Sequence, residues 1–318
     1  MDEQANRVTD QVPSEVLIAV EGVRHVYRGG TVALDGVNLR IGTGLFGLLG
    51  PNGAGKSTLM RIICTLLVPT AGRVTVGGHD VVGGRRQVRR LLGYLPQEFG
   101  AWRLHRVEEV LDTLAYLSGL SGRDERRRRV GEVLEAVGLD QVADRKVKKL
   151  SGGMVRRLGV AQALVHEPRL LVVDEPTVGL DPEERLRFRQ LMAQLGRERV
   201  IVLSTHIVAD LGSGCSDMAL IDRGQVVFRG SPAELVRQAR GRVVELNLPL
   251  AEESTPPADL EIVSRSVAGD RVLVRGVVGD GRGPAGAAKV EPTLEEGYLA
   301  FMAARGRTAV AVVQEVAP

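Results

Sequence analysis

Short runs of aliphatic residues alternate along the chain with segments in which apolar residues recur every three or four positions. Several runs contain no polar residue, which is typical of parallel strands covered on both faces. We therefore expect strands at 16–20, 45–49, 73–76, 91–95, 170–173, 200–203, 218–221 and 226–228. The periodic segments predict helices after Ser57, from about Arg106, from about Arg123, after Ser151, from about Pro182 and after Ser231. This alternation indicates an α/β fold with a largely parallel sheet.

One stretch, about 98–150, is predicted to be almost purely helical and so to form a helical insertion within the α/β core. Within it a helix is expected to begin at Ser121, capped by its hydroxyl with Asp124 three residues on, and to end at Gly138. The basic run 126–129 is interpreted as a solvated helix face, paired in part with Asp124 and Glu125. A nucleic-acid site there is the less favoured interpretation.

The composition changes after about Gln238, and residues 239–318 are predicted to form a small α+β accessory domain. Residues 261–266 and 271–275 are expected to pair as a hairpin around the turn 268–270. Thr293 and Glu296 have the spacing of a capping box and predict a helix near the C-terminus. We thus expect a flexible tail at 1–14, a main domain at 15–238 and the accessory domain at 239–318.

The composition is that of a globular protein, with 44% hydrophobic and 25% charged residues among 318. A net charge of only +3 does not by itself imply a nucleic-acid partner. Cys64 and Cys215 have neither metal-ligand spacing nor a disulfide framework, which favours a reducing, cytosolic setting. No apolar run reaches the length of a spanning helix, and the first residues are polar and acidic. We expect a cytoplasmic chain that does not cross the membrane by itself.

The most specific motif has the spacing G-x-x-x-x-G-K-[ST] of a phosphate-binding loop and follows the aliphatic strand 45–49. Its residues, all expected to bind ATP, are Gly50, Pro51, Asn52, Gly53, Ala54, Gly55, Lys56, Ser57 and Thr58. Glycines let successive backbone N–H groups point at phosphate oxygens, and the following helix adds its positive end. Lys56 can reach the β- and γ-phosphates, and the Ser57 hydroxyl can bind Mg²⁺. A plain glycine-rich turn is the alternative.

A second motif is the aliphatic strand 170–173, which ends in two carboxylates, Asp174 and Glu175. In doubly wound sheets ligands bind at the carboxyl ends of the strands, where the phosphate-binding loop also lies. Asp174 is therefore expected to assist the Mg²⁺ site, and Glu175 to hold or deprotonate the attacking water. An ordinary helix cap is the alternative for such an acidic pair.

A third motif, Leu150-Ser-Gly-Gly-Met154, places Ser151, Gly152 and Gly153 at the start of a predicted helix, which is again an anion-binding geometry. A simple N-cap is the alternative for Ser151. A protein that binds one nucleotide rarely needs two phosphate-binding motifs. The presence of both 50–58 and 150–154 therefore indicates a composite site shared between two copies.

Over about 15–238 the chain resembles an ATP-binding-cassette (ABC) ATPase. Walker A matches 50–58, Walker B with its catalytic carboxylate matches 170–175, and the LSGGQ signature matches 150–154 with Met154 in place of Gln. The family's glutamine loop, D-loop, switch histidine and adenine-stacking aromatic match Gln97, Asp181, His206 and Tyr27. The departure at Met154 keeps Ser151 and Gly153 and puts in doubt only the coupling role of the fifth position.

The resemblance implies a P-loop NTPase core with an additional antiparallel β portion. It also implies that two subunits sandwich two ATP, each offering its signature to the partner's nucleotide in trans. Mg²⁺ would be held by Ser57, Gln97 and Asp174, and catalysis would involve Glu175, His206, Lys56 and Gln97.

The expected function is to power a transporter, specifically an exporter, through separate membrane-spanning subunits. A homodimer is expected on the inner face of the cell membrane, with no nucleic-acid partner. The segment 292–299 and the stretch 94–100 resemble stand-alone subunits of bacterial multidrug and antibiotic exporters. The alternatives are a soluble ABC ATPase of DNA repair, chromosome organisation or translation, and a nucleotide-gated scaffold. Because 239–318 contain no catalytic motif, their removal is expected to spare ATP binding and basal hydrolysis.

Overall fold

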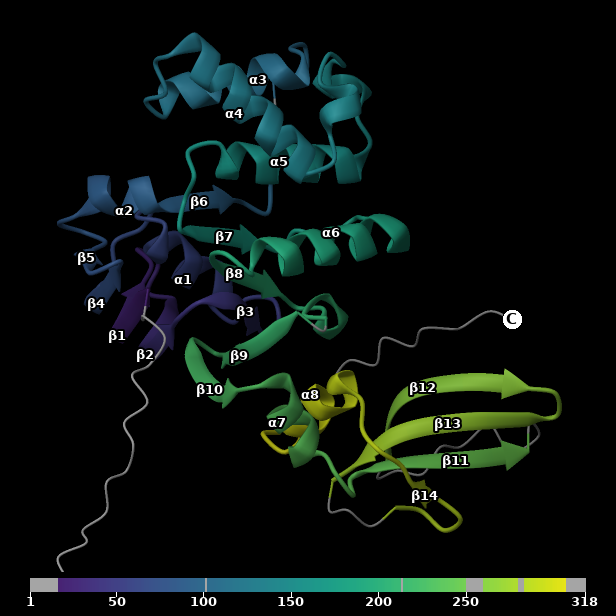
Figure 1. Ribbon diagram of the computed structural model, residues 1–318. Helices are drawn as coiled ribbons and strands as arrows, with labels where there is room; N and C mark the ends of the chain where they lie inside the picture. The colour runs from purple at the N-terminus through teal and green to yellow at the C-terminus, as the bar shows by residue number, and fades with distance from the viewer. Residues whose placement is uncertain (1–16, 101, 213, 250–259, 280–282, 307–318) are drawn as a thin grey trace, which may run out of the picture. The chain divides into compact units, whose positions relative to one another are not determined.

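The computed structural model describes residues 17–100, 102–212, 214–249, 260–279 and 283–306 (Figure 1). The predicted tail at 1–14 and Val16, the first residue of the predicted strand 16–20, lie outside them. The chain forms two compact units: the first runs to His206 and includes Ala219–Phe228, and the second contains Ile207–Met218 and everything from Arg229. None of the helices in the described residues is both long and apolar enough to span a bilayer.

A six-stranded sheet in the order β10-β9-β3-β8-β7-β6 forms the centre of the first unit. Its strands are β3 (Gly44–Leu49), β6 (Leu92–Leu95), β7 (Leu170–Asp174), β8 (Val200–Thr205), β9 (Cys215–Asp222) and β10 (Gln225–Gly230). Strand β8 pairs in parallel with β3 and β7, and β7 pairs in parallel with β6. Strands β7 and β8 are buried along their whole length, as their uninterrupted apolar runs predict. The predicted α/β fold with a largely parallel sheet is confirmed.

A smaller antiparallel sheet, in the order β2-β1-β4-β5, completes the β structure of this unit. It contains β1 (Ile18–Val26), β2 (Val32–Ile41), β4 (Ala71–Val76) and β5 (His79–Asp80). The second half of β1 and all of β2 were not expected from the sequence. Buried residues in these strands alternate with exposed polar ones such as Asp35, Asn38 and Arg40, so they form no apolar run.

The helices of this unit are α1 (Lys56–Ile63), α2 (Arg85–Leu91), α3 (Val107–Leu117), α4 (Arg123–Ala136), α5 (Gly152–Leu164) and α6 (Pro182–Leu195), with short 3₁₀ turns η1 (Asp140–Val142) and η2 (Val147–Lys149). Figure 1 shows α3 and α4 grouped beyond the edge strand β6, which confirms the helical insertion. Helix α2 was not predicted, because Val88 is its one buried residue among four arginines.

Two details of the predicted insertion are wrong. The N-cap of α4 is Gly122 and makes no side-chain cap bond, so the proposed cap by Ser121 does not form. The basic run is not a uniformly solvated face. Arg126 Nε donates to Asp112 at 2.9 Å, and Arg129 donates to the carbonyls of Leu164 and Val165 at the end of α5. Arg126 therefore links α4 to α3, and Arg129 links α4 to the end of α5, instead of pairing with Asp124 and Glu125.

The second unit contains η3 (Val208–Asp210), α7 (Pro232–Gln238), β11 (Val243–Pro249), β12 (Leu260–Ala268), β13 (Arg271–Val278), β14 (Ala288–Lys289) and α8 (Leu294–Ala303). Its antiparallel sheet has the order β12-β13-β11-β14. The β12–β13 hairpin confirms the expected one, and the capping box of α8 is present, with Glu296 N donating to Thr293 Oγ1 at 3.2 Å. The unit also takes in 207–218 and 229–238, which the sequence-based division assigned to the main domain.

Candidate functional site

The phosphate-binding loop connects β3 to α1 and depends on two glycines for its shape. A Cβ on Gly50 would lie 2.2 Å from the carbonyl oxygen of Ile221, which is too close for any side chain. Gly55 has φ 109°, and a Cβ there would lie 2.5 Å from Ala33 O. The loop is therefore packed closely against the neighbouring backbone at both ends, and only glycine satisfies this geometry.

Lys56, the first residue of α1, is buried, and its ammonium group has three partners. Nζ donates to Gly50 O at 2.8 Å and to Pro51 O at 3.1 Å, and it lies 3.2 Å from Glu175 Oε1. A lysine ammonium has three N–H donors, so this set satisfies all of them. The arrangement places a positive charge inside the loop, where triphosphate oxygens would bind.

The two acidic residues come from the end of β7, where its neighbour β8 also ends. Leu49 pairs in register with Thr205, and Asp174 pairs with Ser204, so the phosphate-binding loop, the carboxylates and the residues after β8 begin at one edge of the sheet. Figure 1 shows β3, β8 and β7 as neighbours in that order. Parallel strand pairing therefore brings the phosphate-binding loop together with two segments that lie more than 100 residues later in the sequence.

Ser204 joins the two carboxylate positions through its hydroxyl. Its Oγ donates to Asp174 Oδ1 and accepts the backbone N–H of Glu175 at 3.1 Å. All three residues are buried. Ser204 was not predicted as a site residue. The available signal was a hydroxyl residue at the end of an otherwise aliphatic strand.

Glu175 is held from both sides in an unusual backbone conformation. Its φ is 45°, a region that residues with a side chain seldom occupy. Oε1 faces Lys56, and Oε2 lies 3.1 Å from Nδ1 of His206, whose side chain is about one-third exposed. Strained backbone held by surrounding structure is often found at functional sites. The geometry orients one buried carboxylate toward the phosphate-binding loop and toward the strand end after β8.

The residues named for Mg²⁺ have the right donor chemistry. Ser57, Gln97 and Asp174 offer hydroxyl, amide and carboxylate oxygens, which are the donors that this hard cation prefers. Ser57 and Gln97 follow β3 and β6, and Asp174 is the last residue of β7. Parallel pairing aligns the carboxyl ends of these strands. The described residues contain no group of three His, Cys, Asp or Glu that could hold a metal.

Tyr27 lies beside the phosphate-binding helix. Its hydroxyl is 3.0 Å from Thr58 Oγ1, and its ring makes an edge contact with His25 at 4.7 Å between centroids. The ring remains partly exposed, at 38%. His25, which fits no motif, is buried and helps to support this tyrosine. A fixed aromatic ring next to the loop is a suitable platform for a nucleobase.

The signature residues open helix α5. Ser151 Oγ accepts the N–H of Met154 at 3.2 Å, so this serine is an N-cap, as the plain alternative requires. Ser151 and Gly152 are both exposed, whereas Gly153 is buried against Glu184 of α6. Asp181 caps α6 by accepting the N–H of Glu184 at 2.9 Å. The helix start is therefore both capped and open to a partner.

Gln97 has an exposed side chain, but its backbone is tied to the signature helix. Arg156 of α5 donates from Nη1 to Gln97 O at 2.5 Å and to Pro96 O at 3.4 Å. The segment after β6 and the helix that begins at Ser151 are therefore fastened to each other. This contact was not predicted, since arginine four residues after a predicted helix start carries no motif.

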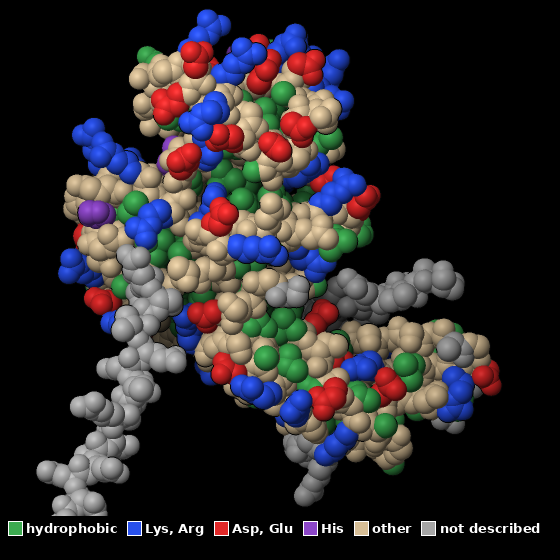
Figure 2. Space-filling model, in the orientation of Figure 1, with side chains coloured by type: hydrophobic (Ala, Val, Ile, Leu, Met, Phe, Trp, Pro, Cys, Tyr) green, Lys and Arg blue, Asp and Glu red, His purple; other side chains and the backbone are tan. Residues whose placement is uncertain are grey.

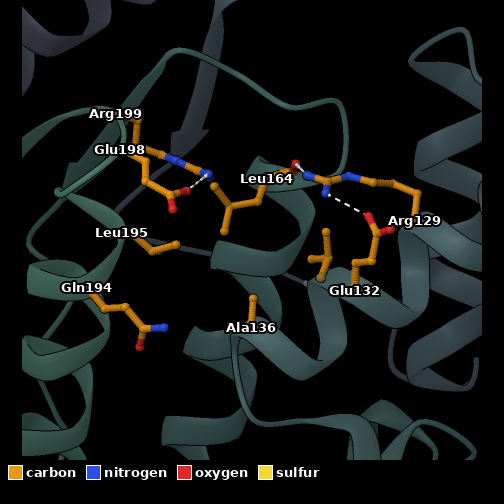
Figure 3. Close-up of a pocket in the computed structure, with 9 residues that line it drawn as sticks. Arg129, Glu132, Ala136, Leu164, Gln194, Leu195, Glu198 and Arg199 are labelled. Atoms are coloured by element: carbon orange, nitrogen blue, oxygen red, sulfur yellow. Dashed lines mark hydrogen bonds and ion pairs between the residues drawn. The ribbon is translucent and has the colours of Figure 1, made fainter.

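Outside these motifs, two further features carry no phosphate chemistry. Burial raises the pKa of the Cys64 thiol well above its usual range, and nearby Asp174 adds to this, so the thiol stays protonated. A pocket of about 160 Å³ lies among α4, α5 and the end of α6 (Figure 3). In it Arg129 forms an ion pair with Glu132 and donates a hydrogen bond to the Leu164 carbonyl.

Residues 34–178 match the sequence profile of the ABC transporter family. Over 236 residues the chain is 37% identical to the Nod factor export ATP-binding protein I of Rhizobium sp. (strain N33), covering 73% of this chain and 77% of that protein. The chain belongs to the ABC transporter family. This ABC protein is also similar in structure to cbiO1 from Clostridium perfringens, part of the ABC transporter complex cbiONQ, with TM-score 0.64 and 29% identity over 70% of this chain and 91% of that one.

A second solved structure adds the reaction class. The dimeric post-hydrolysis structure of the ATP-binding cassette MJ0796, bound to ADP and Pi, matches with TM-score 0.61 and 27% identity, covering 68% of this chain and 98% of that one. The family and fold expected from the motifs are thus confirmed. This ABC subunit is a nucleotide-binding ATPase.

Proposed function

We propose that this chain is the motor subunit of an exporter, in which two copies close around two ATP molecules and drive separate membrane subunits. The observation that carries the proposal is the Glu175 carboxylate, held between Lys56 and His206 beside a complete phosphate-binding loop. Export is supported by the relative named for Nod factor export. The position would be cytoplasmic, at the inner face of the membrane.

In the proposed site, the backbone N–H groups of 50–58 and Lys56 bind the phosphates, and Tyr27 stacks on the adenine. Ser57, Gln97 and Asp174 hold Mg²⁺, which when bound neutralises charge on the phosphate oxygens. The close packing of Gly50 and the burial of Lys56 support this assignment, because they make the loop a preformed cradle.

Glu175 is the proposed general base. It accepts a proton from water as the water oxygen bonds to the γ-phosphorus and the bond from that phosphorus to the β-phosphate bridging oxygen breaks, giving ADP and phosphate. His206 orients the carboxylate through its contact with Oε2. Ser204 fixes both acidic residues, since one hydroxyl bonds Asp174 and the Glu175 backbone.

The second copy completes each site. The exposed Ser151 and Gly152, with Gly153 behind them, are proposed to face the γ-phosphate bound by the partner, and Asp181 to lie at the same interface. The alignment with a dimeric cassette supports this arrangement. An exposed N-terminus of a helix is suited to an anion supplied from outside the chain.

The membrane subunits need a docking surface. In the first unit, large apolar side chains are exposed at Leu66, Trp102, Leu104, Tyr116 and Leu117. Trp102 and Leu104 lie in the segment between Gln97 and α3, and Tyr116 and Leu117 lie at the end of α3. We propose these exposed side chains as the surface for the permease. A contiguous exposed apolar patch marks a protein–protein interaction site, whereas single exposed apolar residues are normal on a protein surface.

A soluble ABC ATPase acting on DNA or the ribosome remains the alternative. On the face seen in Figure 2, basic and acidic side chains are interspersed over the helical insertion, whereas a nucleic-acid backbone favours a basic stripe. The test is to isolate the chain from its host's membranes and identify what copurifies, with phosphate release from ATP measured in parallel. Copurification with a multispanning protein supports the transporter, and recovery with nucleic acid or ribosomes alone refutes it.

A further inference from the structure

The chain changes from the first compact unit to the second directly after His206. It crosses between the units three times, after His206, after Met218 and after Phe228, and only the first crossing adjoins a residue of the proposed site. His206 occupies a bend after β8, and Ile207 alone separates it from η3. The placement of the imidazole therefore depends on what holds the chain on both sides of the bend.

The upstream side is fixed by the central sheet. All six residues of β8 are buried, and the strand is paired with β3 on one side and β7 on the other. The downstream side is η3, where Val208, Asp210 and Leu211 are buried. Its turn is closed by hydrogen bonds from Asp210 N to Ile207 O at 3.0 Å and from Leu211 N to Val208 O at 3.2 Å. A short 3₁₀ turn has little stability of its own, so its position depends on its neighbours.

Helix α8 is the element of the second unit that packs on η3. It also packs on α7, and Gly297 faces the backbone of α7. A Cβ on this glycine would lie 3.2 Å from both Leu235 O and Val236 Cα. Gly297 therefore allows α8 to lie close to α7, and a branched side chain such as valine would overpack this contact.

Helix α8 is tied at its start to β13 and near its end to the turn that precedes β11. At its start, buried Glu296 receives two hydrogen bonds from Arg275 of β13, at 2.9 and 3.1 Å, and accepts the N–H of Thr293 at 2.7 Å. Near its end, Arg242 Nη1 donates to Ala300 O at 3.1 Å. These bonds make α8 a fixed support for η3 instead of a loosely attached terminal helix.

We propose that α8 is a positioning element for His206, which acts by holding η3 and thereby setting the orientation of the imidazole toward Glu175. Gly297 is its main positioning residue. The second unit then controls hydrolysis without contributing a group to the site. The inference rests on the proposed function, because it assumes that His206 takes part in hydrolysis. It departs from the expectation that residues 239–318 can be removed without loss of basal hydrolysis.

The test uses the full chain with Gly297→Val, matched by Ala304→Val, which places the same side chain at an exposed position at the end of α8. Gly297→Val is expected to lower the hydrolysis rate at saturating ATP by about tenfold or more, the scale expected for misplacing a site group. The Kd for ATP should stay unchanged, because the phosphate-binding loop is untouched. Ala304→Val should match the natural protein in both measurements.

A second comparison asks whether the effect runs through His206. In a His206→Ala background, followed by single-turnover phosphate release, Gly297→Val should cause no further loss. Amide exchange of 207–211 should be faster in Gly297→Val than in the natural protein. An equal loss in both backgrounds, or unchanged exchange at 207–211, overturns the proposal.

Arg275→Met provides an independent variant if Gly297→Val fails to bind ATP through misfolding, since it loosens α8 without adding bulk. It should give the same pattern of slower turnover, intact binding and faster exchange. Normal turnover in Arg275→Met together with unchanged exchange would count against α8. Failure of the proposed function is separately visible, because then the natural protein hydrolyses no ATP or Glu175→Gln hydrolyses it normally.

Discussion

Lys56 Nζ lies 3.2 Å from Glu175 Oε1, and both side chains are almost fully buried. The pair connects the phosphate-binding loop directly to the end of β7. Buried charges require partners, and each of these has more than one: two carbonyl oxygens for Lys56 and the His206 imidazole for Glu175. The lysine proposed to bind phosphate and the glutamate proposed to activate water are thus in direct contact with each other.

Glu175→Gln should leave ATP binding intact and slow hydrolysis by at least about 100-fold, the usual scale for losing a general base. The amide keeps the shape of the side chain but cannot accept the proton of the attacking water. Phosphate release and nucleotide Kd are the measurements, and ATP should then trap a long-lived dimer. Turnover close to normal would exclude Glu175 as the catalytic carboxylate.

Lys56→Ala should weaken ATP binding itself, because it removes the positive charge that faces the phosphates. It should also destabilise the protein, since Glu175 loses a buried partner. The double variant Lys56→Ala with Glu175→Gln should be destabilised less than the sum of the two single variants. A double-mutant cycle in denaturant measures the difference, expected at about 1 kcal/mol or more. Additive losses would mean that the contact contributes nothing.

Mixing two inactive proteins tests whether the signature acts in trans. Lys56→Ala inactivates the phosphate-binding loop of the subunit that carries it. Ser151→Arg blocks the signature surface that this subunit presents to the ATP bound by its partner. In a mixed dimer one site carries both defects, while the other combines an intact loop with an intact signature. Mixing should therefore restore single-turnover hydrolysis at up to one site per mixed dimer, because phosphoryl transfer depends on groups from both halves.

Dimer formation and ATP binding should be recorded in the same samples. Mixed dimers that form and bind ATP but release no phosphate would contradict the trans arrangement, provided that each site can act alone. That condition is checked by pairing the natural protein with Lys56→Ala, which should retain hydrolysis.

Gly153→Ala should destabilise the first unit, although alanine is a better helix former. The added Cβ would lie 2.2 Å from Glu184 Oε2, and this carboxylate is held by Arg157 and Arg187. The expected loss is about 1–3 kcal/mol. Gly152→Ala is the matched control, since its Cβ would meet nothing within 4 Å. Denaturation followed by the fluorescence of Trp102, the single tryptophan, reports on this unit.

Truncating the opposing side chain should reverse the effect. In a Glu184→Ala background, Gly153→Ala should lower the free energy of unfolding much less, because the carboxylate that clashes with the added Cβ has been removed. An unchanged loss of stability in that background would mean that Gly153 is required for a reason other than the contact with Glu184.

Glu296 should give the second unit a pH-dependent stability. Burial raises the pKa of Glu296, but the Arg275 hydrogen bonds and the Thr293 N–H outweigh it and lower the pKa below its usual range. A carboxyl with a lowered folded-state pKa stabilises the fold above its unfolded pKa of about 4.3 and loses that contribution as the pH falls through the folded value. The stability difference between the natural protein and Glu296→Gln should be constant above about pH 5 and shrink below about pH 4.

Calorimetric melting of both proteins across this range measures the difference. Glu295→Gln, an exposed neighbour, is the control and should show no such trend. A difference that persists unchanged to low pH would mean that Glu296 does not act through its charge.

The sequence was most informative where burial on both faces left uninterrupted aliphatic runs. Strands β3, β7 and β8 were located in this way, and the motifs that follow them meet at one sheet edge because parallel register requires it. Strand β2 was missed because its outward positions are polar, and α2 because a short surface helix needs only one buried side chain. Both depend on tertiary contacts that periodicity does not contain.

The proposed site was predictable in its residues but not in its contacts. Lys56 and Glu175 each belong to a recognisable motif, yet their ion pair depends on the positive φ of Glu175. Ser204 and Arg156 carry no motif and are identified only by the groups that they touch. The support of η3 by α8 links residues about 90 positions apart in a region without catalytic motifs.

The discontinuity of the second unit limits how such proteins can be recombined. Its parts, 207–218 and 229 onward, are separated by ten residues that belong to the first unit. A hybrid gene with a single junction near 229 or 239 would combine η3 from one parent with α8 from the other. The packing surfaces of η3 and α8 would then not have evolved together. Chimeras that exchange 207–218 along with the C-terminal part keep the pair intact. A recombination event with a single crossover should therefore be tolerated best when it lies before 207, because residues 207–218 and the C-terminal part then come from the same parent.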